Sequence, residues 1–271
     1  MSQVPERALP PSAAALVMLA WKSTFAALLR MPGMFLGLVV LSLLISLGGE
    51  WLLAQFLFGR ELPKWVTAWP LLTWVGLIVV RVALESIVVA LAAVAISRFI
   101  LLGQTSALRS VRDGRVWRFA AWLIAFQLVV WMLLLVPLRP GLALIKFVIF
   151  AAAAIMAVRS VLIFPAIAVD DPAKGRIATS WSQTQDQFWR IVLVFGGTLL
   201  PVFLLQFTVG LGVLVGWFAQ GSLSSLLSVA LQVPAAVLEV VGMALGAAVA
   251  SWVYMWVMEN PRPVETAPKV A

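Results

Sequence analysis

The sequence predicts an all-α protein that crosses a membrane several times as one polytopic bundle of transmembrane helices. Hydrophobic residues make up 63% of its 271 positions, and charged residues only 11%. So few charged groups cannot cover the surface of a soluble globule of this size. The apolar residues also gather in runs long enough for the roughly 20-residue helix that a ~30 Å hydrocarbon core requires. We therefore expect six spans, together with amphipathic helices at the membrane surface.

The chain is expected to begin at the membrane surface. Residues 1–11 contain three prolines and no apolar period, which is typical of a disordered tail. Ser12 is a favourable N-cap, and within residues 12–30 the apolar positions recur at steps of three and four, with Lys22 and Arg30 between them. This pattern predicts an interfacial helix. A cleaved signal peptide is the alternative, and the lack of a basic cluster before the Ala-rich run argues against it.

Residues 12–258 are expected to form a single transmembrane domain, which prolines and polar connectors divide into spans. Pro32 precedes the first span, and Pro137 follows the third. A second interfacial helix, 172–189, is predicted between the fourth and fifth spans, and a Pro-rich tail, 259–271, ends the chain. The predicted spans are 34–58, 70–102, 119–136, 142–168, 191–218 and 222–258.

Charge asymmetry orients this arrangement. With the N-terminus inside, 13 of the 19 Lys and Arg residues fall in cytoplasmic segments, four in outer segments, and Arg81 and Arg159 within the spans. Cytoplasmic loops of membrane proteins carry such an excess of basic residues. Both termini, and both tails, are therefore expected in the cytoplasm. The same rule accounts for the net charge of +8, so nucleic acid is not expected as a partner.

Most familiar catalytic constellations are missing from this sequence. It has no Cys and no His, which excludes disulfides, thiolate metal sites and the commonest general base. It also lacks the glycine-rich motifs that bind phosphates or dinucleotides. Asp170 and Asp171 are not followed by the further acidic residues that a Mg²⁺ site for lipid-phosphate transfer needs. We expect no enzymatic activity, no metal and no cofactor.

Arg81, Glu85 and Glu239 are the charged residues within predicted spans that could form one cluster. Arg81 and Glu85 are spaced to share one helix face, and Glu239 joins them if the second and sixth spans lie at similar depth. An internal ion pair that fixes helix packing is the favoured interpretation, because no further acid and no His continues a proton or substrate relay. Counting from either end of the second apolar run places Arg81 and Glu85 at the outer interface or in mid-membrane, so their depth stays open.

Arginines gather in the second connector. Arg109, Arg112, Arg115 and Arg118 recur at every third position, and Arg159 lies in the last third of the fourth span. Such residues attract anionic lipid headgroups on the cytoplasmic side, although the orientation rule alone also explains them. Gly242-x-x-x-Gly246 permits close helix contact, which makes a homodimer or a membrane-protein partner an open alternative.

The segment from Pro165 to Arg190 is the most informative part of the chain. Asp170 or Asp171 is expected to cap a helix that starts at Pro172. At 100° per residue, this helix places Ile177, Trp181, Thr184 and Phe188 on one face, as in a helix half-sunk in the interface.

The same segment carries a family resemblance. Its motifs are Arg159-x-x-Leu162-x-x-Pro165-Ala166, Ser180-Trp181-x-x-Thr184 and Phe188-Trp189-Arg190-Ile191, with Ser97-Arg98-Phe99-Ile100-Leu101-Leu102-Gly103 at the end of the second span. They resemble a broad group of bacterial six-span inner-membrane proteins, most of them uncharacterised. The group includes the membrane domain attached to some glycerophosphodiester phosphodiesterases. The resemblance implies a multi-pass protein of the bacterial plasma membrane. It implies no phosphodiesterase activity, since the chain has no His and no soluble domain.

The expected function is that of a non-enzymatic scaffold, regulator or lipid-interacting module. A small transporter or channel that uses Arg81, Glu85 and Glu239 is the alternative, and a membrane-embedded enzyme that uses Glu239 or the two aspartates is a weaker one. A polar cavity reaching the intramembrane charges would favour the transporter. A sealed apolar bundle with an exposed basic rim would favour the scaffold.

Overall fold

The computed structural model describes residues 12–58, 70–105, 114–135, 143–171, 177–218 and 222–259, and within these ranges all regular structure is helical. The predicted all-α class is therefore confirmed. The tail 1–11 and nearly all of 259–271 lie outside the described residues. The elements are α1 (Ala13–Arg30), α2 (Pro32–Phe58), α4 (Pro70–Leu102), α6 (Gly114–Leu135), α7 (Ala143–Arg159), α8 (Ile163–Val169), α9 (Ile177–Thr184), the 3-10 helix η2 (Gln185–Gln187), α10 (Phe188–Phe218) and α11 (Ser222–Glu259).

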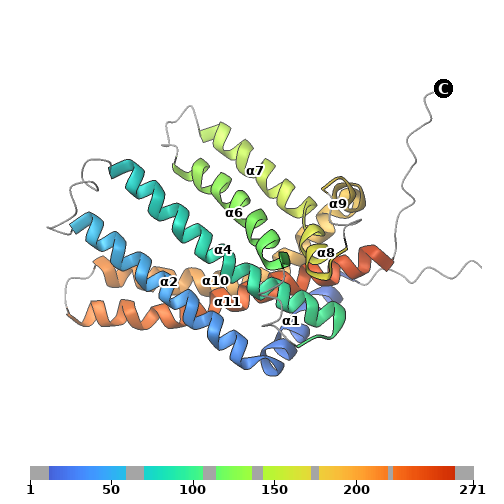
Figure 1. The fold of residues 1–271 in the computed structure, drawn as a ribbon, viewed down its shortest axis with the longest axis horizontal. Helices are drawn as coiled ribbons and strands as arrows, with labels where there is room; N and C mark the ends of the chain where they lie inside the picture. Colours follow the sequence, from blue (N-terminus) through green and yellow to red (C-terminus); the bar gives the residue numbers. More distant parts are fainter. Residues whose placement is uncertain are drawn as a thin grey trace, which may run out of the picture.

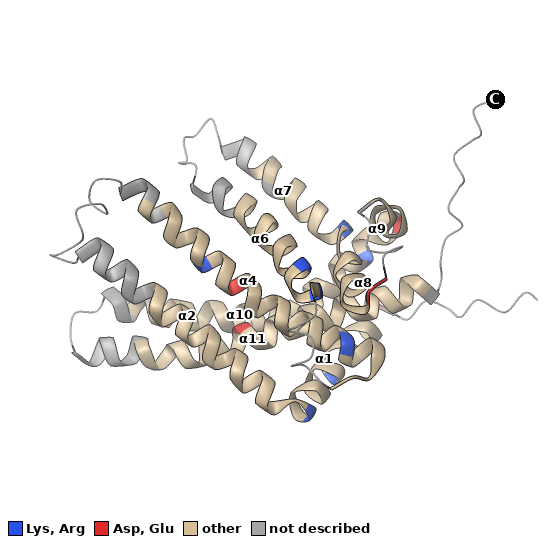
Figure 2. Ribbon diagram, in the orientation of Figure 1, with Lys and Arg blue, Asp and Glu red and all other residues tan. Residues whose placement is uncertain are grey.

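Helices α4 and α11 form the centre of the bundle. α4 packs against α2, α6 and α11, while α11 packs against α1, α2, α4 and α10 (Figure 1). α8 and α9 lie at the end of the bundle where α4 and α11 finish. Most of the Lys and Arg residues that the structure describes gather there (Figure 2). We call it the basic end, defined by Lys22, Arg30, Arg98, Arg115, Arg118, Arg159 and Arg190.

Six helical stretches of the described residues are long and apolar enough to cross a membrane, which makes this a multi-pass membrane protein. They are Ala13–Arg30, Pro32–Gly49, Val75–Leu102, Phe147–Val169, Ala178–Val213 and Val229–Met258. These six stretches differ from the six predicted spans in two helices, α1 and α6. α1 qualifies, as the least apolar of the six. α6 (Gly114–Leu135) is not among them, although it covers most of the predicted third span 119–136, which stays a prediction.

Helix α1 lies across several helices of the bundle instead of beside one of them. Its Val17 faces Gly197 of α10, its Ser23 Oγ accepts a 3.1 Å hydrogen bond from the Trp252 indole of α11, and Arg30 lies over the ring of Phe99 at the end of α4. The predicted cap is confirmed, since the Ser12 hydroxyl accepts a 3.1 Å bond from the N–H of Ala15. The buried face consists of Leu16, Ala20, Thr24 and Ala27. This transverse placement is compatible with the predicted interfacial position.

The predicted fourth span is broken near its end. α7 stops at Arg159, a turn follows, and α8 begins at Ile163. Pro165 lies in the first turn of α8, where its missing N–H removes no intrahelical hydrogen bond, whereas within a continuous helix it would. The break therefore lets the chain accommodate the proline without losing a bond.

The expectation that Asp170 or Asp171 caps a following helix is wrong for Asp170. Asp170 instead ends α8 in the left-handed conformation, with φ of 61°, and its N–H bonds to the carbonyls of Ala166 and Ile167. Short polar side chains tolerate this conformation better than most. Pro172 lies outside the described residues. The next described helix begins at Ile177, so the part of 172–189 that is described divides into α9, η2 and the start of α10.

The predicted close-contact glycines of α11 face the chain's own interior. A Cβ at Gly242 would meet Val202 of α10 at 3.5 Å, and a Cβ at Gly246 would meet nothing within 4 Å. Gly246 lines an apolar cavity of about 350 Å³ between α4, α6, α7, α8, α10 and α11. Whether either glycine also serves a homodimer stays a prediction.

Gly246→Ala is expected to stabilise the protein by about 1 kcal/mol, because alanine favours the helix and its methyl group enters empty space. Thermal unfolding in detergent, followed by circular dichroism, measures the effect. Gly212→Ala is the matched control, since a Cβ there would come within 2.9 Å of Leu231 and force that side chain to move. A Gly246→Ala protein less stable than the Gly212→Ala protein would contradict the prediction.

Candidate functional site

The predicted intramembrane charges lie among α2, α4 and α11. Arg81 Nε donates a 2.7 Å hydrogen bond to Glu85 Oε1 on the same helix, which confirms the predicted pair. Ser42 of α2 donates a 2.5 Å hydrogen bond to the Glu239 carboxylate of α11. A Cβ at Gly49 of α2 would lie 3.8 Å from Arg81 Cδ, so the glycine leaves room for the arginine stem. The charges and Ser42 thereby connect three helices.

Glu85 and Glu239 lie at the same level of the bundle. Near the basic end, Ser251 of α11 donates a 3.0 Å hydrogen bond to Ser97 of α4. Glu85 precedes Ser97 by twelve residues, and Glu239 precedes Ser251 by twelve. At 1.5 Å per residue, both carboxylates lie ~18 Å along the helices from this bond. Glu239 therefore lies at a depth similar to that of Arg81 and Glu85, as the predicted three-residue cluster requires.

Two polar partners in this region were missed by sequence reasoning. Ser42 is one, and the other is the 3.1 Å hydrogen bond that Ser86 of α4 donates to Gln127 of α6. Single Ser and Gln residues within apolar runs carry no periodic signal. Their partners are 197 and 41 positions away in the sequence, so only the packed helices reveal the pairs.

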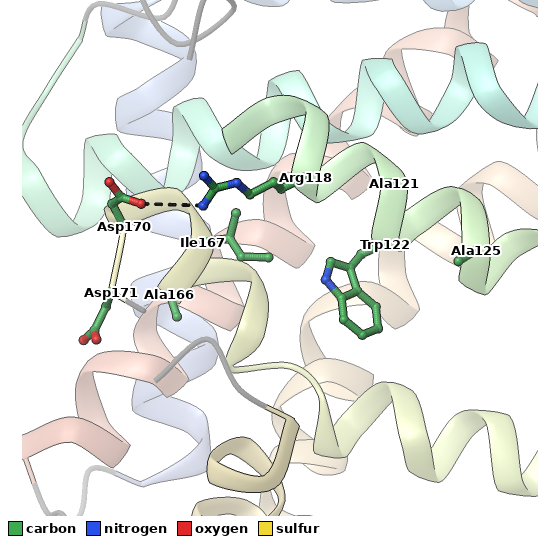
Figure 3. Close-up of a pocket in the computed structure, with 8 residues that line it drawn as sticks. All are labelled: Arg118, Ala121, Trp122, Ala125, Ala166, Ile167, Asp170 and Asp171. Atoms are coloured by element: carbon green, nitrogen blue, oxygen red, sulfur yellow. Dashed lines mark ion pairs between the residues drawn. The ribbon is translucent and has the colours of Figure 1, made fainter. Parts of the chain in front are cut away.

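The arginines of the second connector meet a carboxylate. Asp170 receives a 3.3 Å hydrogen bond from Arg115 Nη2, and its other oxygen lies 4.0 Å from Arg118 Nη1 (Figure 3). The two arginines come from the start of α6, and Asp170 ends α8. Arg109 and Arg112 lie outside the described residues. Part of the predicted basic rim is thus paired, through an aspartate 55 positions from Arg115.

A cleft of about 570 Å³ opens between α6 and α8 beside this ion pair. Arg118 and Asp170 stand at one side of it, and Trp122 extends toward α8 from the next turn of α6 (Figure 3). Most of the remaining lining is apolar and small. The complete lining is Arg118, Ala121, Trp122, Ala125, Ala166, Ile167, Asp170 and Asp171. The cleft therefore combines charged groups at the basic end with an apolar surface along α6.

The residues of the family resemblance form a joint between α7, α8 and α9. The Ser180 hydroxyl donates to the carbonyl of Arg159, and the Arg159 guanidinium lies 5.2 Å from the ring of Trp181. Thr184 is buried and donates a 2.8 Å bond to the carbonyl of Ser180. Leu162, Pro165 and Ala166 are buried beneath them. The motif residues thus hold the broken fourth span against the next helix.

The last motif residues belong to the start of α10. Phe188 packs edge-on against Trp189, whose own side chain is exposed. The Arg190 guanidinium lies 4.4 Å from the ring of Trp256 near the end of α11, a cation–π contact. Phe188 and Trp189, predicted to end the surface helix 172–189, instead begin α10, and Arg190 lies where α10 meets α11.

The end of α8 is also tied to α11. Tyr254, the single tyrosine of the sequence, donates a 3.1 Å hydrogen bond to Asp171 Oδ2. In the described ranges no three acidic side chains come together as a metal site would require. The charged and apolar groups of the cleft are suited to binding a ligand that has both kinds of surface.

No protein-family model matches the chain, and no curated protein or solved structure matches it.

Proposed function

We propose that the protein is a non-enzymatic, phospholipid-binding module of a bacterial plasma membrane, with both termini in the cytoplasm. The observation that carries this proposal is the α6/α8 cleft, where the Arg118 guanidinium stands beside an apolar surface that includes Trp122. A phospholipid has the same two parts, a phosphate and apolar chains. Arginine binds phosphate through its planar fork of N–H donors.

The charge distribution supports this role and orientation. Seven basic residues lie at the basic end, and cytoplasmic faces of membrane proteins carry such an excess. These residues attract anionic headgroups in general, at about 1 kcal/mol per Lys or Arg near the surface, while the cleft holds an individual lipid. The bacterial inner membrane is part of the proposal because of the motif residues Arg159, Ser180 and Trp181, which resemble a group of inner-membrane proteins.

Lipid binding is favoured over transport by the α6/α8 cleft, which places a cation beside an apolar surface. The transporter alternative requires a polar route to Arg81, Glu85 and Glu239. Neither the α6/α8 cleft nor the apolar cavity includes these residues in its lining. The intramembrane charges are better explained as an internal ion pair and a hydrogen bond that join helices.

Arg118→Ala is expected to weaken phospholipid binding about tenfold, because it removes the charge-assisted hydrogen bonds to the phosphate. The measurement is the number of phospholipids per chain that remain after purification and a fixed detergent wash, counted by mass spectrometry. Lys22→Ala is the matched control, since Lys22 is exposed at the same end and does not line the cleft. Equal lipid retention by the wild-type and Arg118→Ala proteins would refute the proposal.

A further inference from the structure

The charged groups that line the cleft have both signs. Arg118 is the basic one, and Asp170 and Asp171 are the acidic ones. A headgroup with only negative charge would place its phosphate near Arg118 and also close to the Asp170 carboxylate, which repels it (Figure 3). The cleft therefore suits a headgroup that carries a positive charge next to its phosphate.

The two aspartates are fixed before any ligand arrives. The left-handed backbone of Asp170 is held by its N–H bonds at the end of α8, and Arg115, with a side chain only 24% exposed, holds its carboxylate. Asp171 is held by the hydroxyl of Tyr254. Fixed groups lose little conformational freedom when they bind a ligand, which favours a defined binding geometry.

Arg118 differs from Arg115 in how it is placed. Its side chain is 71% exposed, and its 4.0 Å distance to Asp170 Oδ1 is too long for a hydrogen bond. A guanidinium has five N–H donors, so Arg118 can bind a phosphate without giving up a hydrogen bond to Asp170. A site for a phosphate and a site for a cation thus lie next to each other, on Arg118 and Asp170.

We propose that the cleft selects a zwitterionic phospholipid with a primary amine, of the phosphatidylethanolamine class, with its phosphate on Arg118 and its ammonium on Asp170. This inference rests on the proposed lipid-binding function and names its ligand. A primary ammonium donates hydrogen bonds to carboxylate oxygens, whereas the quaternary ammonium of phosphatidylcholine has no N–H to donate. Phosphatidylglycerol has no cation to place beside the aspartates.

The apolar part of the cleft requires a lipid and not the free headgroup. Trp122, Ala121 and Ala125 line α6 next to the charged groups, and Ile167 and Ala166 face them from α8. Acyl chains that lie along this surface bury apolar area, which soluble phosphoethanolamine cannot do. The ligand therefore enters from the bilayer.

The test is a lipid competition on the full-length protein. The purified chain, stripped of bound lipid in detergent, is incubated with an equimolar mixture of dioleoyl phosphatidylethanolamine, phosphatidylcholine and phosphatidylglycerol, and native mass spectrometry identifies the single bound lipid. The wild-type protein should bind phosphatidylethanolamine about tenfold more often than either competitor, as one charge-assisted contact predicts. Soluble phosphoethanolamine should leave this ratio unchanged.

Asp170→Asn should abolish most of the preference for phosphatidylethanolamine, since asparagine keeps the left-handed backbone but loses the negative charge. Asp186→Asn is the matched control, because Asp186 is exposed on η2 and does not line the cleft. Arg118→Ala should weaken all three lipids alike.

Four results would overturn the inference while leaving the lipid-binding function in place: preference for phosphatidylglycerol, equal binding of phosphatidylcholine, an unchanged preference in the Asp170→Asn protein, or displacement of the lipid by phosphoethanolamine. Absence of any lipid adduct on the wild-type protein would instead remove the proposed function itself.

Discussion

Arg81→Ala is expected to lower the free energy of unfolding by about 3 kcal/mol, because it leaves carboxylates within the hydrocarbon layer without their cation. Glu85 loses its 2.7 Å partner, and Glu239 lies at the same level of the bundle. The substitution also removes the arginine stem that lies against Gly49 of α2. Thermal unfolding in detergent or lipid nanodiscs, followed by circular dichroism, measures the loss.

The double variant Arg81→Leu with Glu85→Leu is the control for this prediction. It removes both charges and leaves the hydrogen bond between Ser42 and Glu239 in place, so it should recover most of the stability that the single variant loses. If the double variant is no more stable than Arg81→Ala, the pair does not act as a unit. An Arg81→Ala protein that unfolds at the same temperature as the wild-type protein would contradict the prediction.

Leu162→Ala is expected to cost about 3 kcal/mol, because it removes a side chain that is 1% exposed and leaves a cavity in the joint between α7 and α8. α8 forms one wall of the α6/α8 cleft, so the proposed phospholipid retention should fall together with stability. Chemical unfolding in detergent and the lipid count used for Arg118 measure the two effects.

Leu193→Ala provides the matched control for the Leu162 substitution. Its side chain is 66% exposed on α10, where no packed core depends on it, and the change should cost less than about 0.5 kcal/mol. Equal losses for the two leucines would show that the joint is not a packed core. A large loss of stability with full lipid retention would show that α8 does not position the cleft.

Helix type and position follow directly from local sequence in this protein. Long apolar runs specify helices because a chain in lipid must satisfy every backbone hydrogen bond internally. The N-cap of α1 could also be predicted from local sequence, since Ser12 directly precedes the helix and bonds to its first turn. The spacing of Arg81 and Glu85 also predicted their ion pair, because residues four apart share a helix face.

The misjudged features depend on competition between local signals or on contacts distant in sequence. Asp170 is followed by Asp171 and Pro172, a sequence that is typical of a helix start. Asp170 nevertheless ends α8, because a short polar residue is favourable at either end of a helix. The break before Ile163 lies in an apolar run whose hydrophobicity hides the turn. The candidate cleft was not predicted, since it exists only where Arg118 and Asp170 meet across two helices.

The transverse course of α1 has a consequence for how the protein is made. The contacts of Val17 and Ser23 are with Gly197 of α10 and Trp252 of α11, and Ser23 and Trp252 are 229 positions apart. Because a chain is made from its N-terminal side, α1 keeps its Leu16 face uncovered until α10 and α11 have followed it into the membrane. During that interval lipid must shield this face, so α1 reaches its final packing later than it is made.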